Sequence, residues 1–358
     1  MRSAGWLVRW VCVASRLCLV LGEAPATRIL PKHSISGVSA GADMAVNHFV
    51  ALSGSVVGAG IVAGAPYGCN LVEGSDDKCG SAPAGTRWSK LLPRFATYMH
   101  SRAAAGLIDP LTSLRGKRVF LFSGRSDWVV ARSVMQAVKR QLSRFTGPGT
   151  IKSDFHVNAA HGWVVDGATC GSGPPGSSSS WCEPCCCSPS SLLACKGHDL
   201  AGRLLQHIHG KGSRRRAHAR APLIAVPQAP YAMEGRTLDD SGLWHTAYVY
   251  APWRCRIPGE WWCKIHVHYH GCAWGAEYTG TDLLMRLGLV EWAEALDMVV
   301  VFPQASSTTD EAGCWDWTGK TGTLFDTRRG AQLHAVAGLL KDLPRILESE
   351  VQPEPIAV

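Results

Sequence analysis

The sequence predicts an α/β protein in which helices cover both faces of a largely parallel β-sheet. Short apolar runs bounded by glycine or proline are typical of buried strands, and they alternate along the chain with segments of helical character. Such alternation favours parallel pairing, because each crossover helix lies on a face of the sheet. The composition agrees: 46% of the 358 residues are hydrophobic and only 18% are charged, which excludes a disordered chain.

The predicted elements follow one another in two blocks. In the first block the strands are expected after residue 29 and at 58–65, 119–123 and 151–157, with helices at 42–52 and 199–209. In the second block they are expected at 245–250, 265–269 and 298–302, with helices at 281–296 and 331–348. The Ser/Pro/Gly/Cys-rich stretch at about 171–194 and the basic stretch at about 210–222 lack periodicity and are predicted surface loops.

The N-terminus resembles a secretory signal peptide over residues 1–24. Arg2 and Arg9 precede apolar runs, small residues follow around residue 23, and Arg16 interrupts the apolar core. The alternatives are an uncleaved signal anchor or a poorly ordered tail. Secretion is therefore the predicted localisation, with no membrane association after cleavage.

The formal charge of +8 does not indicate a nucleic-acid partner. Three positive charges lie in the predicted signal, and a second cluster at 211–220 has no aromatic residues between its basic ones. A solvated loop explains this cluster. The sequence leaves the oligomeric state open.

Two cysteine and histidine patterns raise the question of a metal. Cys182 and Cys185 have zinc-ligand spacing, but no second such pair follows, so a loop with one disulfide and spare thiols is the preferred interpretation. His266, His268 and His270 share one face of a predicted strand, and a buried strand face is preferred over a zinc site there. We expect neither a metal nor a cofactor.

A G-x-S-x-G pentapeptide at residues 37–41 places Ser39 between a predicted strand and a predicted helix. In that context the motif indicates a nucleophile elbow, a strained turn that exposes the serine hydroxyl. A serine hydroxyl becomes a good nucleophile only when a histidine takes its proton and a carboxylate orients that histidine. Asp127 and His161 follow two later strands in the order Ser, Asp, His, and they are the predicted partners. Taken alone, each could be an ordinary loop residue.

The strand that should carry an oxyanion loop comes late in the chain. Residues 264–272 form a predicted strand that runs into His270-Gly271-Cys272, and a helix and the strand at 298–302 follow. An ordinary α/β-hydrolase places these elements ahead of its serine. We therefore predict a circularly permuted α/β-hydrolase fold, with one catalytic domain over residues 25–350.

These motifs, taken in order, resemble the secreted polyhydroxybutyrate depolymerases of the circularly permuted, single-domain kind. The resemblance extends from about residue 29 to 347, through ISGVSAGADMAVNHF, VFLFSGRSDWVV, CKIHVHYHGC, EWAEALDMVVVFPQ and GCWDW. It implies that Ser39 is the nucleophile, His161 the general base and Asp127 its orienting carboxylate. It also implies an oxyanion hole made by the backbone N–H groups of Ala40 and Cys272. Disulfides are expected between Cys69 and Cys79 and between Cys255 and Cys263.

The substrate is predicted less directly than the reaction. By resemblance Trp317 lies beside the substrate cleft, but Lys320 stands near where the family tends to carry an aromatic residue. The stretches at 171–195 and 214–221 also look atypical. A polyester or a small ester is the expected partner, with feruloyl, acetyl or other short-chain esters as the first alternative. A non-catalytic secreted binding protein with a hydrolase fold is the alternative from another class.

Overall fold

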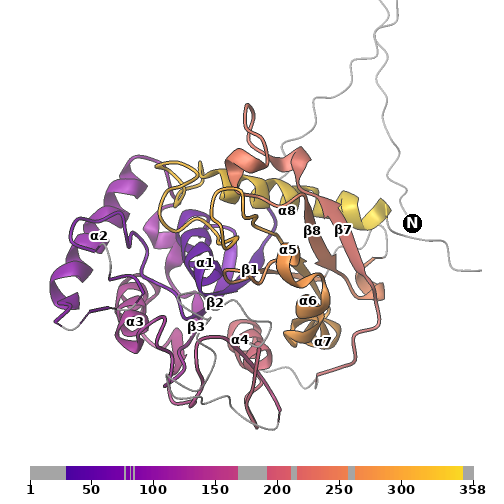
Figure 1. Cartoon of the computed structure of the whole chain (residues 1–358), viewed down its shortest axis with the longest axis horizontal. Helices are drawn as coiled ribbons and strands as arrows, with labels where there is room; N and C mark the ends of the chain where they lie inside the picture. Colours follow the sequence, from indigo (N-terminus) through magenta and orange to yellow (C-terminus); the bar gives the residue numbers. More distant parts are fainter. Residues whose placement is uncertain are drawn as a thin grey trace, which may run out of the picture.

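The computed structural model describes residues 30–75, 78–80, 82–83, 85–167, 192–210, 216–256 and 263–349. Its centre is an eight-stranded sheet in the order β4-β3-β2-β1-β9-β10-β8-β7 (Figure 1). The strands of this sheet are β1 (His33–Val38), β2 (Val56–Val62), β3 (Arg118–Phe122), β4 (Ile151–Asp154), β7 (Leu223–Pro227), β8 (Thr246–Tyr250), β9 (Lys264–Tyr269) and β10 (Met298–Phe302). Two short strands, β5 (Trp163–Val165) and β6 (Leu192–Ala194), pair with each other separately.

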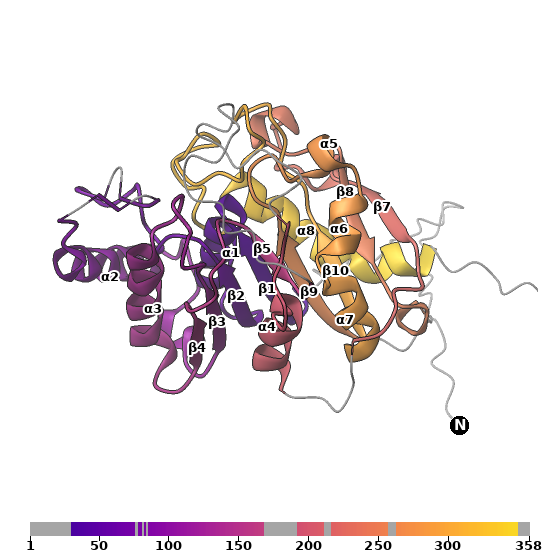
Figure 2. The same ribbon diagram turned by 60° about the horizontal axis from the view of Figure 1, so that its bottom comes forward.

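Helices cover both faces of the sheet, as predicted (Figure 2). One face is covered by α1 (Ala40–Ala51), α2 (Trp88–Ala104), α3 (Arg132–Thr146) and α8 (Ala331–Ser349). The other face is covered by α4 (Leu200–His209), α6 (Asp282–Arg286) and α7 (Leu289–Leu296). A single-turn helix, α5 (Ala276–Thr279), follows β9.

The order of the strands confirms the permuted α/β-hydrolase arrangement. β1 pairs in parallel with β2 on one side and with β9 on the other, although β9 lies more than 200 residues later in the chain. β10 extends the sheet in parallel beyond β9, β8 pairs antiparallel with β10, and the edge strand β7 pairs antiparallel with β8. The late strands therefore complete the sheet beside the strand that leads to Ser39.

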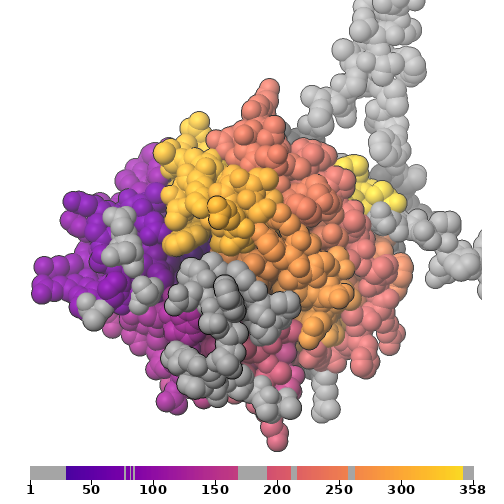
Figure 3. All heavy atoms as spheres, in the orientation of Figure 1, coloured from indigo at the N-terminus to yellow at the C-terminus, as the bar shows by residue number. Residues whose placement is uncertain are grey.

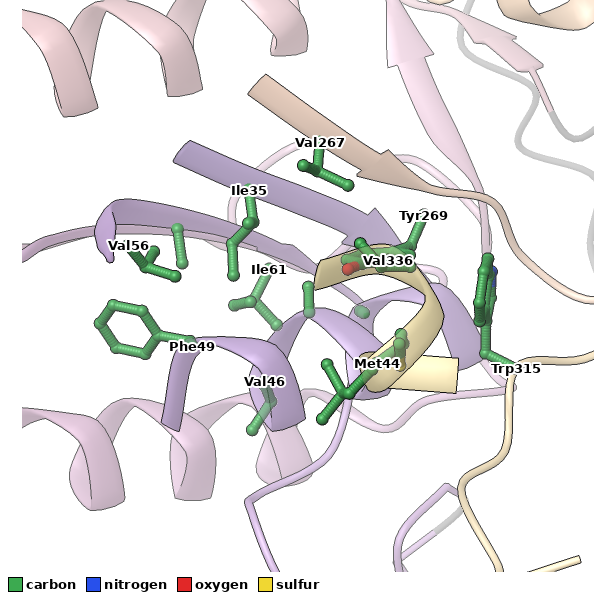
Figure 4. Packing of buried hydrophobic residues seen from close by; sticks show 14 of the residues in the cluster. Ile35, Met44, Val46, Phe49, Val56, Ile61, Val267, Tyr269, Trp315 and Val336 are labelled. Atoms are coloured by element: carbon green, nitrogen blue, oxygen red, sulfur yellow. The ribbon is translucent and has the colours of Figure 1, made fainter. Parts of the chain in front are cut away.

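Two apolar layers, one on each face, hold the sheet and helices together. Figure 4 shows the layer beneath α1, where Met44 and Phe49 of the helix meet Ile35 and Ile61 of the strands. All four side chains are at most 1% exposed. Full burial of such a side chain contributes about 1.5–3 kcal/mol, so this contact fixes α1, and with it the turn at Ser39, against the sheet.

The structure corrects several of the predicted boundaries. The strand expected at 58–65 is Val56–Val62, and the strand expected at 151–157 ends at Asp154. The helix expected at 281–296 is two short helices, because Gly288 has φ 80°, a conformation that interrupts a right-handed helix. The loop expected at 171–194 ends earlier, since Leu192–Ala194 form β6. The predicted signal peptide, Cys182 and Cys185 lie outside the described residues. None of the helices in the described ranges is long and apolar enough to cross a membrane.

Three disulfides link described cysteines. The expected pairs Cys69–Cys79 and Cys255–Cys263 are confirmed. A third bond joins Cys272 to Cys314, 42 residues apart. It ties the loop after β9 to the segment that carries Trp317.

Candidate active site

Ser39 occupies the turn between β1 and α1 in a strained backbone conformation, with φ 57° and ψ −130°. The two glycines of the pentapeptide make this turn possible. A Cβ on Gly37 would lie 2.0 Å from the carbonyl oxygen of Gly41, and one on Gly41 would lie 2.2 Å from that of His270. Any larger residue at these positions would push the turn away from its neighbours, so the tight turn requires both glycines of the motif.

The structure brings Asp127 and His161 together. They follow β3 and β4 respectively, and His161 Nδ1 lies 2.9 Å from Asp127 Oδ2. The second carboxylate oxygen of Asp127 accepts hydrogen bonds from the backbone N–H groups of Val129 and Val130, at 3.0 and 2.9 Å. An anchored carboxylate of this kind selects the tautomer with the proton on Nδ1, which leaves Nε2 of His161 with a free lone pair. Nε2 is buried and has no hydrogen-bond partner among the described residues.

The loops that carry Asp127 and His161 are joined by their backbones. Arg125 N donates to Val157 O at 2.8 Å, and Ser126 N donates to Ala159 O at 3.0 Å. Gly124 allows this approach, because a Cβ there would lie only 2.1 Å from Ala159 O. The relative position of the carboxylate and the imidazole is thus set by main-chain contacts.

The backbone N–H groups of Ala40 and Cys272 are available as donors. Neither forms a hydrogen bond with another described residue. The orientation of the Cys272 N–H is set indirectly: buried His270 donates from Nδ1 to Gly271 O at 2.8 Å and accepts at Nε2 from Ala305 N at 3.1 Å. Since a peptide group is planar, fixing the carbonyl of Gly271 also fixes the N–H of Cys272.

Ser39 and the two backbone donors border one cleft of about 280 Å³, and neither Asp127 nor His161 is among the residues that line it. Ser39, Ala40 and Cys272 line it, together with the side chains or backbone of Asp43, Cys79, Gly80, Val129, Val130, Asp310, Ala312, Cys314 and Trp317. Figure 3 shows the yellow C-terminal segment reaching onto the indigo N-terminal part of the molecule. Hydrogen bonds between these parts, such as Asn70 Nδ2 to Trp317 O at 3.3 Å, hold that segment in place.

Trp317, the tryptophan expected beside a substrate cleft, is one of the residues that line this cleft. Its side chain is partly buried and lines the cleft beside Ser39. Lys320 lies at the surface, where its ammonium is 2.6 Å from the carboxylate of Asp310, another cleft residue. An ion pair therefore stands at the cleft through Asp310.

Asp43 is a cleft residue that sequence reasoning missed. It lies in the first turn of α1, and its Oδ1 accepts a hydrogen bond from Ala65 N at 2.6 Å. Burial raises the pKa of this carboxyl to about 7. An acidic residue two positions after the last glycine of the pentapeptide was the available signal.

The histidines of β9 form hydrogen bonds with serines of β1 on the face that packs against α4 and α7. His266 lies 2.8 Å from both Ser34 Oγ and Ser36 Oγ through its two ring nitrogens, and His268 Nδ1 lies 2.8 Å from Ser36 Oγ. All of these side chains are at most 1% exposed. Within the described ranges, no group of three His, Cys, Asp or Glu side chains is placed to hold a metal ion. The buried-face interpretation of these histidines therefore agrees with the structure better than a zinc site.

No protein-family model matches the chain. Among curated proteins, a poly(3-hydroxybutyrate) depolymerase from Delftia acidovorans is 28% identical over 330 residues, which cover 91% of this chain. The chain spans only 62% of the length of that relative. A polyhydroxybutyrate depolymerase from Talaromyces funiculosus is 25% identical over 352 residues, covering 94% of this chain and 96% of the relative.

Two solved structures match the whole fold. A polyhydroxybutyrate depolymerase complexed with an R3HB trimer superposes with a TM-score of 0.73 at 24% identity, and it covers 90% of this chain and 98% of its own. The depolymerase from Penicillium funiculosum gives a TM-score of 0.72 at 25% identity, with the same coverage. In sequence and in fold, the chain is similar to the polyhydroxybutyrate depolymerases, as its motifs predict.

Proposed function

We propose that this protein is an extracellular serine esterase that hydrolyses poly(3-hydroxybutyrate) or its oligomers through an acyl-enzyme. The observation that carries the proposal is the Asp127–His161 hydrogen bond of 2.9 Å, in a fold where Ser39, Ala40 and Cys272 line one cleft. The similarity to polyhydroxybutyrate depolymerases supports the choice of substrate.

In the first half of the proposed reaction, Ser39 Oγ attacks the carbonyl carbon of the ester. His161 Nε2 takes the hydroxyl proton, while Asp127 stabilises the imidazolium that forms. The negative charge on the former carbonyl oxygen is stabilised by the N–H groups of Ala40 and Cys272. The tetrahedral intermediate then collapses: the bond to the alcohol oxygen breaks, His161 returns the proton to that oxygen, and the acyl group remains on Ser39.

In the second half, water replaces the departed alcohol. His161 takes a proton from this water, which attacks the acyl carbon, and the same proton then passes to Ser39 Oγ as the ester bond to the serine breaks. A hydroxyacid is released and the enzyme is restored. Every proton in this cycle moves through His161, so the proposal includes neither a metal nor a cofactor.

An extracellular location is supported by the three disulfides between described cysteines, since such bonds persist in oxidising compartments. Exposed aromatic residues support contact with an apolar solid. Trp128, next to Asp127, is 59% exposed, and Tyr278 is 44% exposed.

A short-chain ester is the second candidate substrate. The ion pair between Lys320 and Asp310 favours it, because a charged edge binds the methyl-bearing polyester less well than an aromatic side chain does. A non-catalytic binding role would require that the arrangement of Ser39, Asp127 and His161 be inert.

The test is the clearing of a suspension of amorphous poly(3-hydroxybutyrate), with hydrolysis of ethyl butyrate measured in parallel. Wild type and a variant with the exposed α2 residue changed, Ser101→Ala, should clear the suspension, and Ser39→Ala should not. Hydrolysis of ethyl butyrate without clearing would leave a short-chain esterase. Neither activity from a folded protein would contradict the proposal.

A further inference from the structure

The geometry points to Asp43 as a specificity residue that selects esters whose acyl unit carries a free hydroxyl, that is, the hydroxyl end of the polyester chain. This inference rests on the proposed function and extends it. It concerns which ester bond of the substrate is bound over Ser39, not how the bond is broken.

Asp43 is held next to the nucleophile by main-chain contacts. Its backbone N–H donates to the carbonyl of Ser39 at 3.2 Å, one turn along α1. Its side chain lines the same cleft as Ser39 and Ala40. A group that binds to Asp43 therefore lies within one helical turn of the reacting serine.

The two carboxyl oxygens of Asp43 have different surroundings. Oδ1 is occupied by the N–H of Ala65 at 2.6 Å. Oδ2 has no hydrogen-bond partner among the described residues, and it is not enclosed in the protein, because the partly exposed side chain opens on the cleft. No cation in the described part of the chain forms an ion pair with Asp43, and the ammonium of Lys320 is 2.6 Å from Asp310. Oδ2 is thus an acceptor without a hydrogen-bond partner among the described residues, on a side chain that lines the cleft of Ser39 and also a smaller pocket beside Ala65 and Asn70.

The chemistry of the polyester decides which part of it suits such an acceptor. Inside the chain, the 3-oxygen of every acyl unit is esterified and has no hydrogen to donate. The unit at the hydroxyl end carries a free 3-hydroxyl, and a hydroxyl that donates to a carboxylate forms a strong, charge-assisted hydrogen bond. The opposite end carries a carboxylate, which the carboxylates of Asp43 and Asp310 repel. Asp43 therefore favours binding of the hydroxyl-terminal unit at the position next to Ser39.

A purely structural role is the competing explanation. A carboxylate in the first turn of a helix is favoured by the helix dipole, and the bond to Ala65 N alone gives Asp43 a reason to be there. Loss of a structural contact would slow the hydrolysis of all esters by a similar factor. Loss of a substrate contact would slow only the ester with the free hydroxyl.

The test uses the trimer of (R)-3-hydroxybutyrate as its methyl ester, with the terminal hydroxyl either free or methylated. The measured quantity is kcat/KM for cleavage of the first ester bond from the hydroxyl end, with products separated by mass spectrometry. Asp43→Asn is the informative variant. Because Ala65 N requires an acceptor, the amide oxygen faces Ala65 and the NH₂ group faces the cleft, so a donor replaces the acceptor while the shape is kept.

We expect the ratio of kcat/KM for the free to that for the capped trimer to fall by roughly 10- to 100-fold in Asp43→Asn, the usual effect of losing a hydrogen bond to a charged group. In wild type the ratio should rise with pH through about 7, where burial places the pKa of Asp43. A pH effect on the bond-breaking step is common to both trimers and cancels in the ratio. The charged groups that line the cleft with Asp43 are Asp310 and, through it, Lys320.

Asp282→Asn is the matched control, since Asp282 is an exposed carboxylate in the first turn of α6 that does not line the cleft, and its substitution leaves the bond between Asp43 and Ala65 in place. It should keep the wild-type ratio. An unchanged ratio in Asp43→Asn, or an equal fall in Asp282→Asn, would overturn the assignment while the proposed function stands. If wild type cleaves neither trimer, the proposed function fails, and the assignment fails with it.

Discussion

Lowering the pH from 7.5 to 5 should destabilise the folded protein by several kcal/mol, because its sheet encloses histidines that are neutral. Burial lowers the pKa of His33 and His270 to about 4 and that of His268 to about 3, from 6.5. Each side chain is at most 3% exposed. Below pH 6.5 these histidines are protonated in the unfolded chain but remain neutral in the folded chain. The stability contributed by these groups is complete above pH 6.5 and is lost as the pH falls towards 4.

The size of the effect follows from these shifts. At pH 5 each of the three histidines lowers the free energy of unfolding by about 2 kcal/mol, because each pH unit below 6.5 costs about 1.36 kcal/mol. Burial lowers the pKa of His48 and His266 as well, which adds to the loss. Asp43 acts in the opposite direction. Because its pKa is raised in the folded protein, protonation of this carboxyl as the pH falls from 7 increases the free energy of unfolding, by at most about 3 kcal/mol at pH 5. The net loss is a large part of the 5–15 kcal/mol that is usual for a folded domain.

The assay is urea unfolding followed by tryptophan fluorescence at pH 7.5, 6.5 and 5. His268→Phe keeps a ring against Trp163, whose indole lies edge-on at 4.8 Å, and removes one titrating group. This variant should lose less free energy of unfolding between pH 7.5 and 5 than wild type does, by about 2 kcal/mol. His156→Phe provides an exposed control. A free energy of unfolding that stays constant down to pH 5, or the full wild-type loss in His268→Phe, would refute the reasoning.

Three further substitutions test the geometry of the candidate site. Asp127→Asn should lower kcat by about 10⁴-fold, because the amide no longer selects the correct tautomer of His161, and wild-type kcat in ester hydrolysis would contradict the proposed pair. Gly124→Ala places a Cβ 2.1 Å from the Ala159 carbonyl, and should cost about 1–3 kcal/mol in urea unfolding and also slow ester hydrolysis; an active variant of normal stability would show that the loop contact is unimportant. His270→Phe removes the donor to the Gly271 carbonyl and should lower kcat by about 10–100-fold with KM little changed, whereas a change in KM alone would argue against control of the oxyanion donor.

The parts of the site that the sequence predicts best are those that depend on local sterics. The turn at Ser39 needs Gly37 and Gly41 whatever surrounds it, because the chain itself fills the space of their missing side chains. The late strand before Cys272 is recognisable because its apolar pattern and its His-Gly ending are contiguous. This strand, β9, pairs with β1, as expected if the oxyanion loop that follows it is to reach Ser39.

The features that sequence reasoning missed depend on partners distant in the chain. The bonds between Ser36 and the β9 histidines join residues about 230 positions apart. The partner of Asp43 Oδ1 is the backbone N–H of Ala65, 22 residues later in the chain. The break at Gly288 is a local event, but glycine is also tolerated inside helices, so the pattern alone could not distinguish one helix from two.

In the proposed reaction Ser39, activated by His161, is the nucleophile that cleaves polyester bonds. The most direct test is covalent labelling with an alkyl fluorophosphonate, followed by peptide mass mapping and by the polymer-clearing assay on the same sample. A single adduct is expected on the peptide that contains Ser39, with clearing lost in proportion to labelling and with slow labelling of His161→Ala. Labelling of another residue, or clearing that persists in the fully labelled protein, would contradict the proposed reaction.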